Sequence, residues 1–135
     1  MSATAKTNVS KPGFMGYLIG GVVAGVITAI LNNLWNFIYP AIGGVSVPDV
    51  INVGSVTMMS ILPMLVAAVG YFVLSRFVHN ATPIFQIGTV VLALLSLFGT
   101  FNPPMPVPDG FAGLSGPMHI IAGLVGAFVI PRFVK

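Results

Sequence analysis

The stretch FMGYLIGGVVAGVITAILNNLWNFIY, residues 14–39, contains no acidic or basic side chain. An α-helix rises about 1.5 Å per residue, so about 20 apolar residues cross the roughly 30 Å hydrocarbon core of a bilayer. Residues 14–39 are long enough for one crossing. They therefore predict a transmembrane helix.

Three further segments have the same character, at about 50–75, 83–101 and 110–131, and His119 is the only acidic or basic residue in any of the four. The chain has 135 residues, of which 56 % are hydrophobic, with five basic and two acidic side chains. So few charges cannot cover the surface of a soluble domain. The sequence predicts an all-α, polytopic bundle of four transmembrane helices. It forms a single membrane domain over residues 1–135, with residues 1–12 as a polar tail.

The acidic and basic residues lie in different connections between the predicted spans. All five basic residues and His79 fall on one side of this threading: Lys6, Lys11, Arg76, His79, Arg132 and Lys135. Asp49 and Asp109 lie in the other two loops. Because basic residues mark the cytoplasmic side of a membrane protein, we expect both termini to be cytoplasmic, in the plasma or inner membrane.

Both acidic residues occur in the tripeptide Val-Pro-Asp, at 47–49 and 107–109. The two following stretches, VPDVINVGSVTMMSI and VPDGFAGLSGPMHII, align without gaps and agree at six of fifteen positions. This similarity suggests two parallel-repeat hairpins. Asp is a favoured N-cap, so we expect Asp49 and Asp109 to cap the second and fourth helices. The alternative is an external cation site that both acids share.

Small and polar side chains mark the expected contact faces, because helices associate in lipid through close packing and hydrogen bonds. Pro63 and Pro117 are expected to kink their helices. The predicted inward residues of the second span are Met59, Ser60, Pro63, Ala67 and Gly70. Those of the first span are Gly16, Gly20, Ala24, Thr28, Asn32 and Asn36, with Gly21 and Gly25 widening the stripe. Those of the fourth span are Ala112, Ser115, Gly116, His119, Gly123 and Gly126, with Leu114, Ile121, Val125 and Phe128 facing lipid. A weaker face on the third span comprises Thr89, Ala93, Ser96 and Thr100.

His119 is the main candidate for chemistry. It lies roughly 14 Å along the fourth helix, near the bilayer centre, where a buried ionisable group is a functional hypothesis by default. One interpretation is a neutral histidine bonded to a neighbouring polar group. The others are proton or substrate handling, and metal or haem ligation, in which an inward Met59 is a conceivable partner.

The stretch ILNNLWNF, residues 30–37, concentrates side-chain amides. Asn32 and Asn36 share a face, whereas Asn33 is expected to point elsewhere. Trp35 and Tyr39 suit an outer aromatic belt. One interpretation is anchoring with interhelical bonding. The other is an amide-lined vestibule with Thr28 and His119 deeper inside, and Ser60 on the facing helix.

The four spans, the triplet Leu95-Ser96-Leu97 and the triplet Met118-His119-Ile120 resemble a family of uncharacterised four-span bacterial membrane proteins, a domain of unknown function. The resemblance implies no activity and no catalytic residue. The small multidrug exporters have the same number of spans. The first span here lacks their membrane-embedded glutamate.

The sequence therefore favours a membrane protein without catalysis, acting as a structural or accessory subunit through helix packing. Its expected partners are the lipid bilayer and copies of itself or other membrane proteins. Nucleic acid is excluded for want of a basic run, and no cofactor or metal is expected. One alternative is a small oligomeric transporter or channel with a path past Asn32, Asn36 and His119. Another is a cofactor-binding subunit of an electron-transfer complex.

Overall fold

A computed structural model describes residues 12–43 and 45–134 of the chain. Four long helices and one short 3₁₀ helix make up its regular structure: α1 Phe14–Gly43, α2 Val53–Phe77, α3 Ala81–Phe101, α4 Phe111–Val129 and η1 Ile130–Phe133. Helices α1, α2 and α3 are each long and apolar enough to cross a membrane. So is the segment Phe111–Phe133, which α4 and η1 form together. The predicted all-α bundle of four spans is confirmed. Residues 1–11 of the tail, which include Lys6 and Lys11, lie outside the described residues, and so does Lys135.

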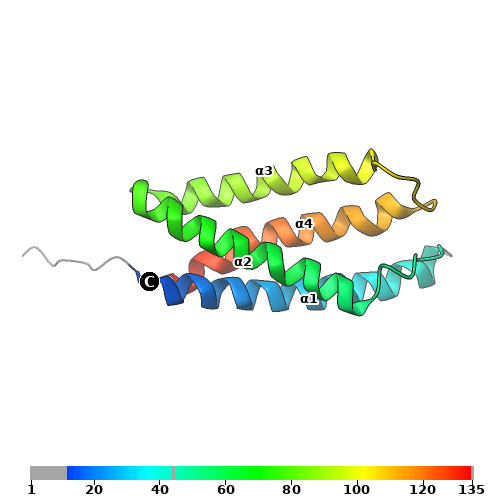
Figure 1. The fold of residues 1–135 in the computed structure, drawn as a ribbon, viewed down its shortest axis with the longest axis horizontal. Helices are drawn as coiled ribbons and strands as arrows, with labels where there is room; N and C mark the ends of the chain where they lie inside the picture. The colour runs from blue at the N-terminus through cyan, green and yellow to red at the C-terminus, as the bar shows by residue number, and fades with distance from the viewer. Residues whose placement is uncertain (1–11, 44, 135) are drawn as a thin grey trace, which may run out of the picture.

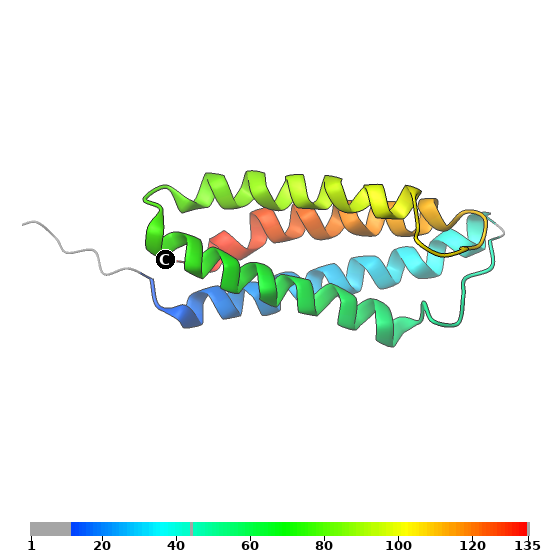
Figure 2. The same ribbon diagram turned by 45° about the horizontal axis from the view of Figure 1, so that its top comes forward.

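The helices run side by side and alternate in direction (Figures 1 and 2). The short connection between α2 and α3 lies at the same end as Pro12 and Val134, and Arg76, His79 and Arg132 lie there too. We call this the basic end. The two longer connections lie at the opposite end and contain Asp49 and Asp109. We call that the acidic end.

Close contact of α1 with two neighbours organises the bundle. A Cβ atom on Gly21 would lie 2.7 Å from the Ala68 Cβ of α2. A Cβ atom on Gly20 would lie 2.7 Å from the Ile130 carbonyl oxygen of η1. Two adjacent glycines therefore bring two different helices against α1. α3 packs mainly on α4, and α1 packs mainly on α2 and then on α4.

The inward face predicted for α2 is wrong by one position. Met59, at 73 % exposure, and Pro63 and Gly70 face outward, and only Ser60 was placed correctly among the buried residues. The buried residues of α2 are Val56, Ser60, Met64, Ala68 and Tyr71. The span is apolar on every side, so its sequence has too little polar contrast to set the rotation of the helix.

The face predicted for α4 is largely correct, because Gly116, Gly123 and Gly126 are buried and Phe128 is exposed. Leu114 is the main exception, at 2 % exposure where a lipid-facing side chain was expected. Val125, also expected to face lipid, is partly buried against the core. The indole of Trp35 donates to the Leu114 carbonyl, so this turn of α4 lies against α1. The spacing of residues along α4 alone does not reveal this contact between helices.

The two aspartates do not cap helices, so that prediction is wrong. The N-cap of α2 is Asn52, whose Oδ1 accepts from the Ser55 amide at 3.1 Å while the Ser55 hydroxyl accepts from the Asn52 amide at 3.0 Å. The N-cap of α4 is Gly110, with a φ of 84° and no side-chain cap bond. Both helices begin later than the sequence suggested.

The proline of each Val-Pro-Asp unit instead begins a hydrogen-bonded four-residue turn. The two turns differ in backbone conformation, because Gly110 has a φ of 84° at the third position, where Val50 has no positive φ. The Ile51 amide donates to the Pro48 carbonyl at 2.8 Å, and the Phe111 amide donates to the Pro108 carbonyl at 3.2 Å. The aspartate occupies the second position of this turn in both cases. The tripeptide is thus a turn signal that ends an apolar connection.

Beyond the turns the two repeats diverge in packing. Under the gapless alignment, Ser60 matches Ile120 and Met64 matches Leu124. Ser60 and Met64 are buried, whereas Ile120 and Leu124 are exposed. α2 begins at Val53 and α4 at Phe111, so the helices start at different distances from the tripeptide. The alignment does not describe how the two hairpins pack.

Prolines lie inside three helices, Pro40 in α1, Pro63 in α2 and Pro117 in α4. Each helix continues through its proline, and α1 runs to Gly43, beyond the predicted end at residue 39. Whether Pro63 and Pro117 bend their helices stays a prediction.

Candidate functional site

A row of polar side chains lies along the contact between α1 and α2. We call it the polar seam, and it comprises Thr28, Asn32, Asn33 and Asn36 of α1 with Thr57 and Ser60 of α2. Thr28, Asn32 and Ser60 are buried, with Asn32 at 6 % exposure. Polar side chains in a span are costly unless they are paired, so such a row inside apolar helices calls for a physical account.

Two hydrogen bonds join the helices across the seam. The Asn32 Nδ2 donates to the Ser60 hydroxyl at 3.1 Å, so two residues predicted for the site come together. The Asn33 Nδ2 donates to the Thr57 hydroxyl at 3.0 Å and to the Ala29 carbonyl at 2.8 Å. Asn33 was expected to point away from the other amides, and that expectation is wrong.

Four buried oxygens of the seam have no hydrogen-bond donor among the described residues. They are Thr28 Oγ1, Asn32 Oδ1, Asn33 Oδ1 and Asn36 Oδ1. Leaving a buried acceptor unpaired costs about 1–3 kcal/mol. The seam therefore contains buried polar atoms that it does not pair: three amide oxygens, which can only accept, and the Thr28 hydroxyl, which can also donate.

Rotating the amides does not pair all of these atoms. The Asn33 amide is held in its orientation because the Ala29 carbonyl can only accept. Exchanging O and N in Asn32 would let Ser60 donate to the oxygen, but it would leave the Asn32 NH₂ group without that partner. Either way a buried polar atom of Asn32 lacks a partner.

His119 lies at the level of the seam but on α4. Along α4 it falls between the Gly113–Leu114 carbonyls, which accept from Trp35, and Ile130, which abuts Gly20. It is therefore level with the part of α1 between Gly20 and Trp35, where Thr28 and Asn32 occur. It is half-buried, and no hydrogen bond joins it to another described residue. The structure places it midway along α4 and shows no hydrogen bond between it and an amide of the seam.

The contact face of α3 differs in kind from the seam. Its hydroxyls bond mainly to their own backbone, Thr89 to the Phe85 carbonyl at 2.8 Å and Ser96 to the Ala93 carbonyl at 2.6 Å. Thr100 lies 3.4 Å from the Ser115 hydroxyl of α4. The predicted α3 face is therefore a contact face, and the helix that it meets is α4. It offers few unpaired polar atoms.

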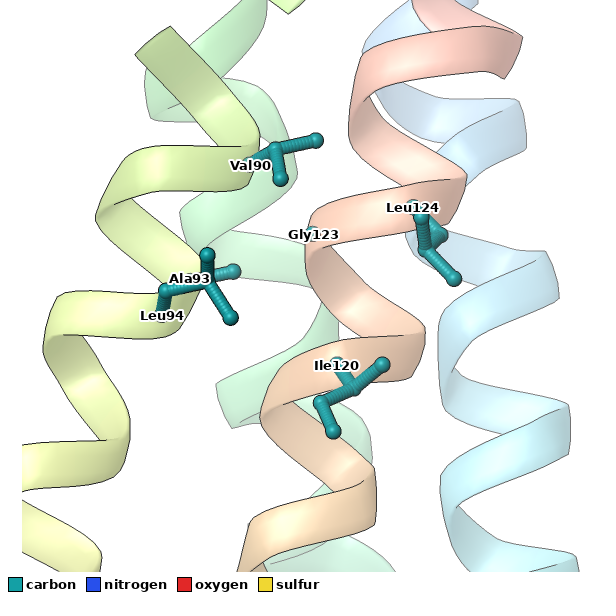
Figure 3. A pocket seen from close by; sticks show the side chains of 6 residues that line it. All are labelled: Val90, Ala93, Leu94, Ile120, Gly123 and Leu124. Carbon is teal, nitrogen blue, oxygen red and sulfur yellow. The ribbon is translucent and has the colours of Figure 1, made fainter. Parts of the chain in front are cut away.

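A shallow apolar groove of about 140 Å³ runs between α3 and α4. Figure 3 shows its walls, with Val90, Ala93 and Leu94 on one side and Ile120, Gly123 and Leu124 on the other. It carries no polar side chain, so it can hold an acyl chain but cannot bind a polar solute.

The sequence did not predict that Asn33 and Thr57 belong to the site, and it assigned Trp35 to an aromatic belt at the membrane surface. The Trp35 Nε1 donates to the carbonyls of Gly113 and Leu114 at 3.2 and 3.1 Å, and the Tyr39 hydroxyl donates to the Gly110 carbonyl at 3.1 Å. Both aromatics tie α1 to the start of α4. Their place near one end of the span is typical of an aromatic belt, so composition alone could not reveal the bonds.

The chemistry open to the site is the binding of donors. Amide and hydroxyl oxygens accept from N–H or O–H groups and coordinate hard cations. Among the described residues, no three His, Cys, Asp or Glu side chains gather in a group that could hold a metal ion. Asp49 and Asp109, the candidates for a shared cation site, lie in turns at the acidic end. They take no part in the seam.

These features define a multi-pass membrane protein with four helices and a buried polar seam. The chain belongs to a family of unknown function (DUF6069), whose model matches residues 5–135. The resemblance to an uncharacterised four-span family is confirmed. No curated protein and no solved structure matches the chain.

Proposed function

We propose that this protein is a membrane protein without catalysis that acts as a structural or accessory subunit, and that α3 is the helix that meets its partner. The observation that carries the proposal is the isolation of α3. Only Ala81, Phe85 and Thr100 of α3 are buried. The helix contacts α4 along one side and α2 near its start, where Tyr71 meets Thr82 and Phe85, and most of its other side chains are exposed.

Two glycines lie on this outward side. Gly88 and Gly99 are exposed, and a Cβ atom on either would meet nothing within 4 Å. Steps of four, three and four residues place Gly88, Leu92, Leu95 and Gly99 on one helix face. Glycine weakens a helix by up to about 1 kcal/mol relative to alanine, and its use in a span is to admit a second helix closely. Inside this chain neither glycine has that use.

The partner that fits this face is another apolar helix, from a second copy of the chain or from a larger assembly. The test is the mass of the intact particle in mild detergent, compared with one chain of 14.0 kDa. The double variant Gly88→Leu, Gly99→Leu is expected to keep its fold, since both positions are open, and to lose its partner. The matched control is Gly70→Leu, which changes an equally open position on α2. A wild-type particle that contains one chain and no other protein would contradict the proposal.

A second candidate function is transport or conduction past Asn32, Asn36 and His119. The observation that favours it is the set of four unpaired oxygens in the polar seam. A state in which α1 and α2 separate would expose these oxygens to water or to a solute, which would offset the cost of leaving them unpaired. The seam would then be the closed form of a polar path.

Flux through purified protein in liposomes tests the second candidate. The variant pair Asn32→Leu with Ser60→Ala replaces both bonded partners with apolar groups, so it should fold and abolish flux. Thr89→Ala on α3 removes a hydroxyl already satisfied by its own helix and should leave flux unchanged. Wild-type liposomes as tight as protein-free ones to cations and small polar solutes would reject this candidate.

The proposed setting is the plasma or inner membrane, with both ends of the chain in the cytoplasm. Arg76, His79 and Arg132 gather at the basic end and both aspartates at the acidic end, as the rule for basic residues requires of that orientation. Labelling of single cysteines placed in the 44–52 and 78–80 connections from outside whole cells tests it. Labelling at 44–52 alone is expected.

A further inference from the structure

His119 lies on the side of α4 that faces both α2 and α3. A Cβ atom on Gly126 would lie 3.1 Å from the Met64 sulfur of α2 and 3.3 Å from the Thr89 Cγ2 of α3. His119 precedes Gly126 by about two turns of helix, so the two residues share one face of α4. The imidazole therefore points to the side of α4 on which α2 and α3 lie, at a level nearer the acidic end.

α2 and α3 meet near the basic end. The Tyr71 ring stacks on Phe85 with 4.4 Å between the ring centres, and the Tyr71 hydroxyl lies 2.6 Å from the Thr82 hydroxyl. Toward the acidic end the two helices diverge, because α2 stays against α1 and α3 stays against α4 (Figures 1 and 2). Met59, in the diverging part of α2, is 73 % exposed, and His119 is only half-buried. The imidazole is thus partly uncovered where α2 leaves α4.

The glycine face of α3 lies on the same side. It comprises the exposed residues Gly88, Leu92, Leu95 and Gly99. These residues continue, at steps of three or four, the side of α3 on which Phe85 stacks on α2. Because α2 diverges, this side of α3 is buried at Phe85 and exposed at the four residues that follow. A helix packed on the glycine face would take the place that α2 leaves.

The glycine face and His119 are at one level of the bundle. A Cβ atom on Gly123 would meet the Ala93 side chain of α3, and one on Gly116 would lie 3.9 Å from a Leu97 methyl group. His119 lies between these two glycines of α4, so it is level with α3 between Ala93 and Leu97. The two open glycines of α3 flank that level, one toward each end. A helix packed on the glycine face would therefore pass beside His119.

The chemistry of His119 and of the glycine face selects the occupant. An imidazole carries at least one N–H donor, and no hydrogen bond joins His119 to another described residue. A polar group at this depth is costly unless it is paired. An acyl chain has no hydrogen-bonding atom to offer, and open glycines serve the close approach of a helix backbone. The occupant is therefore a helix with a hydrogen-bonding side chain.

A second copy of the chain lacks an exposed side chain of this kind at mid-span. Among the exposed described residues of α1 to α4, only Arg76 and Thr82 are polar, and both lie near the basic end. The other exposed residues of these helices are apolar, glycine or proline. A second copy could present only its own half-buried His119. The partner that pairs with His119 therefore belongs to a different membrane protein.

We propose that Gly88, Gly99 and His119 together form the docking site for a transmembrane helix of another membrane protein, and that this helix carries a serine, threonine, asparagine or glutamine at the depth of His119. The glycines admit the backbone of the helix closely, and the hydrogen bond to the imidazole fixes its register. The inference rests on the proposed subunit function and adds the chemistry of the partner.

Energy transfer in liposomes between the full chain and a model transmembrane peptide tests the proposal. The chain contains no cysteine, so a single cysteine placed in the 78–80 connection carries the label. The probe is a leucine–alanine helix of about 20 residues with one central asparagine, and the reference peptide has leucine at that position. The asparagine peptide is expected to bind about threefold to tenfold more tightly than the reference peptide.

Variants assign this preference to the proposed residues. His119→Leu should remove the preference, and His119→Asn, which keeps a hydrogen-bonding group, should retain it. Gly99→Leu should weaken the binding of both peptides. The control is Thr89→Ala, which removes a hydroxyl already bonded to the Phe85 carbonyl and should change neither. Melting curves report whether each variant folds. Moving the asparagine toward one end of the peptide should abolish the preference with the wild-type chain, which requires no variant.

The outcomes separate this inference from the subunit function. Equal binding of the two peptides to the wild-type chain, or a preference that survives His119→Leu, would overturn the role of His119 while binding that depends on Gly99 still supports a partner on α3. Binding of neither peptide, together with a wild-type particle of one chain, would overturn both. Energy transfer between two labelled copies that His119→Leu abolishes would overturn the choice of a different protein as the partner.

Discussion

α1 and α3 are both apolar spans without an acidic or basic residue, yet they have opposite places in the bundle. In the most apolar part of each helix, 39 % of α1 is buried but only 11 % of α3. The glycines explain the difference. Gly20 and Gly21 of α1 each touch a neighbouring helix, whereas Gly88 and Gly99 of α3 touch nothing. In lipid, where apolar burial does not drive association, the contact a glycine admits decides which helix is central.

Their polar side chains differ in the same way. The amides of α1 reach across to α2 and leave oxygens unpaired, while Thr89 and Ser96 of α3 bond to their own backbone. α1 is thus joined to its neighbours by both close packing and hydrogen bonds. α3 is joined to its neighbours by few side-chain hydrogen bonds, and its outward face is exposed in the single chain.

The largest expected effect comes from replacing one glycine of each kind with leucine. Gly20→Leu places a side chain against the Ile130 carbonyl, part of a backbone that cannot give way, and should lower the free energy of unfolding by about 3 kcal/mol or more. The new side chain of Gly88→Leu would enter open space, so the free energy of unfolding should stay unchanged in a monomeric preparation. Unfolding in detergent by a mild denaturant measures both. Equal losses would break the comparison.

The next test concerns the polar seam. Asn32→Leu with Ser60→Ala removes a bonded pair and one unpaired buried oxygen, so the free energy of unfolding should rise by about 1 kcal/mol. The single change Ser60→Ala leaves the Asn32 amide without a partner, so it should lower the free energy of unfolding. Denaturant curves of the three proteins decide between these signs. A large destabilisation by the double change would show that the seam is a structural clamp.

A smaller effect is expected at the link between α2 and α3. Tyr71→Phe breaks the 2.6 Å contact with Thr82, which joins α2 to the start of α3, and should cost about 1 kcal/mol. Because α3 has few other neighbours, its first turns should exchange amide hydrogen faster while α1 stays protected. The control, Tyr17→Phe, breaks a link between α1 and α2 and should leave exchange in α3 unchanged.

The smallest effect is expected on the outward face of α3. Leu92 is 68 % exposed, so Leu92→Ala should change the stability of a single chain by less than about 0.5 kcal/mol. Leu114→Ala, at a buried position of α4, should cost about 2–5 kcal/mol. Thermal melting in detergent compares them. If Leu92→Ala also reduces the mass of the native particle, it locates the partner on α3.

Several features could be read from the amino-acid sequence because they depend on composition and local chemistry. The four spans follow from runs of apolar residues as long as a bilayer is thick. The depth of His119 and the burial of Gly116, Gly123 and Gly126 follow from position and helical spacing. The two Val-Pro-Asp turns are also local, although the sequence could not show that the aspartates remain in the turn and that Asn52 and Gly110 begin the helices.

Other features depend on contacts between residues far apart in the chain, and only the tertiary structure decided them. The rotation of α2 buries Ser60 and exposes Met59, and Asn33 joins Thr57 across the seam. Both depend on the close approach of α2 to α1 at Gly21 and Gly25. Trp35 donates to the Leu114 carbonyl because α1 and α4 lie antiparallel, which brings the end of one helix beside the start of the other. In a chain that is apolar on every face, the sequence determines that helices form and cross the membrane. Which sides meet is determined by where two backbones can approach.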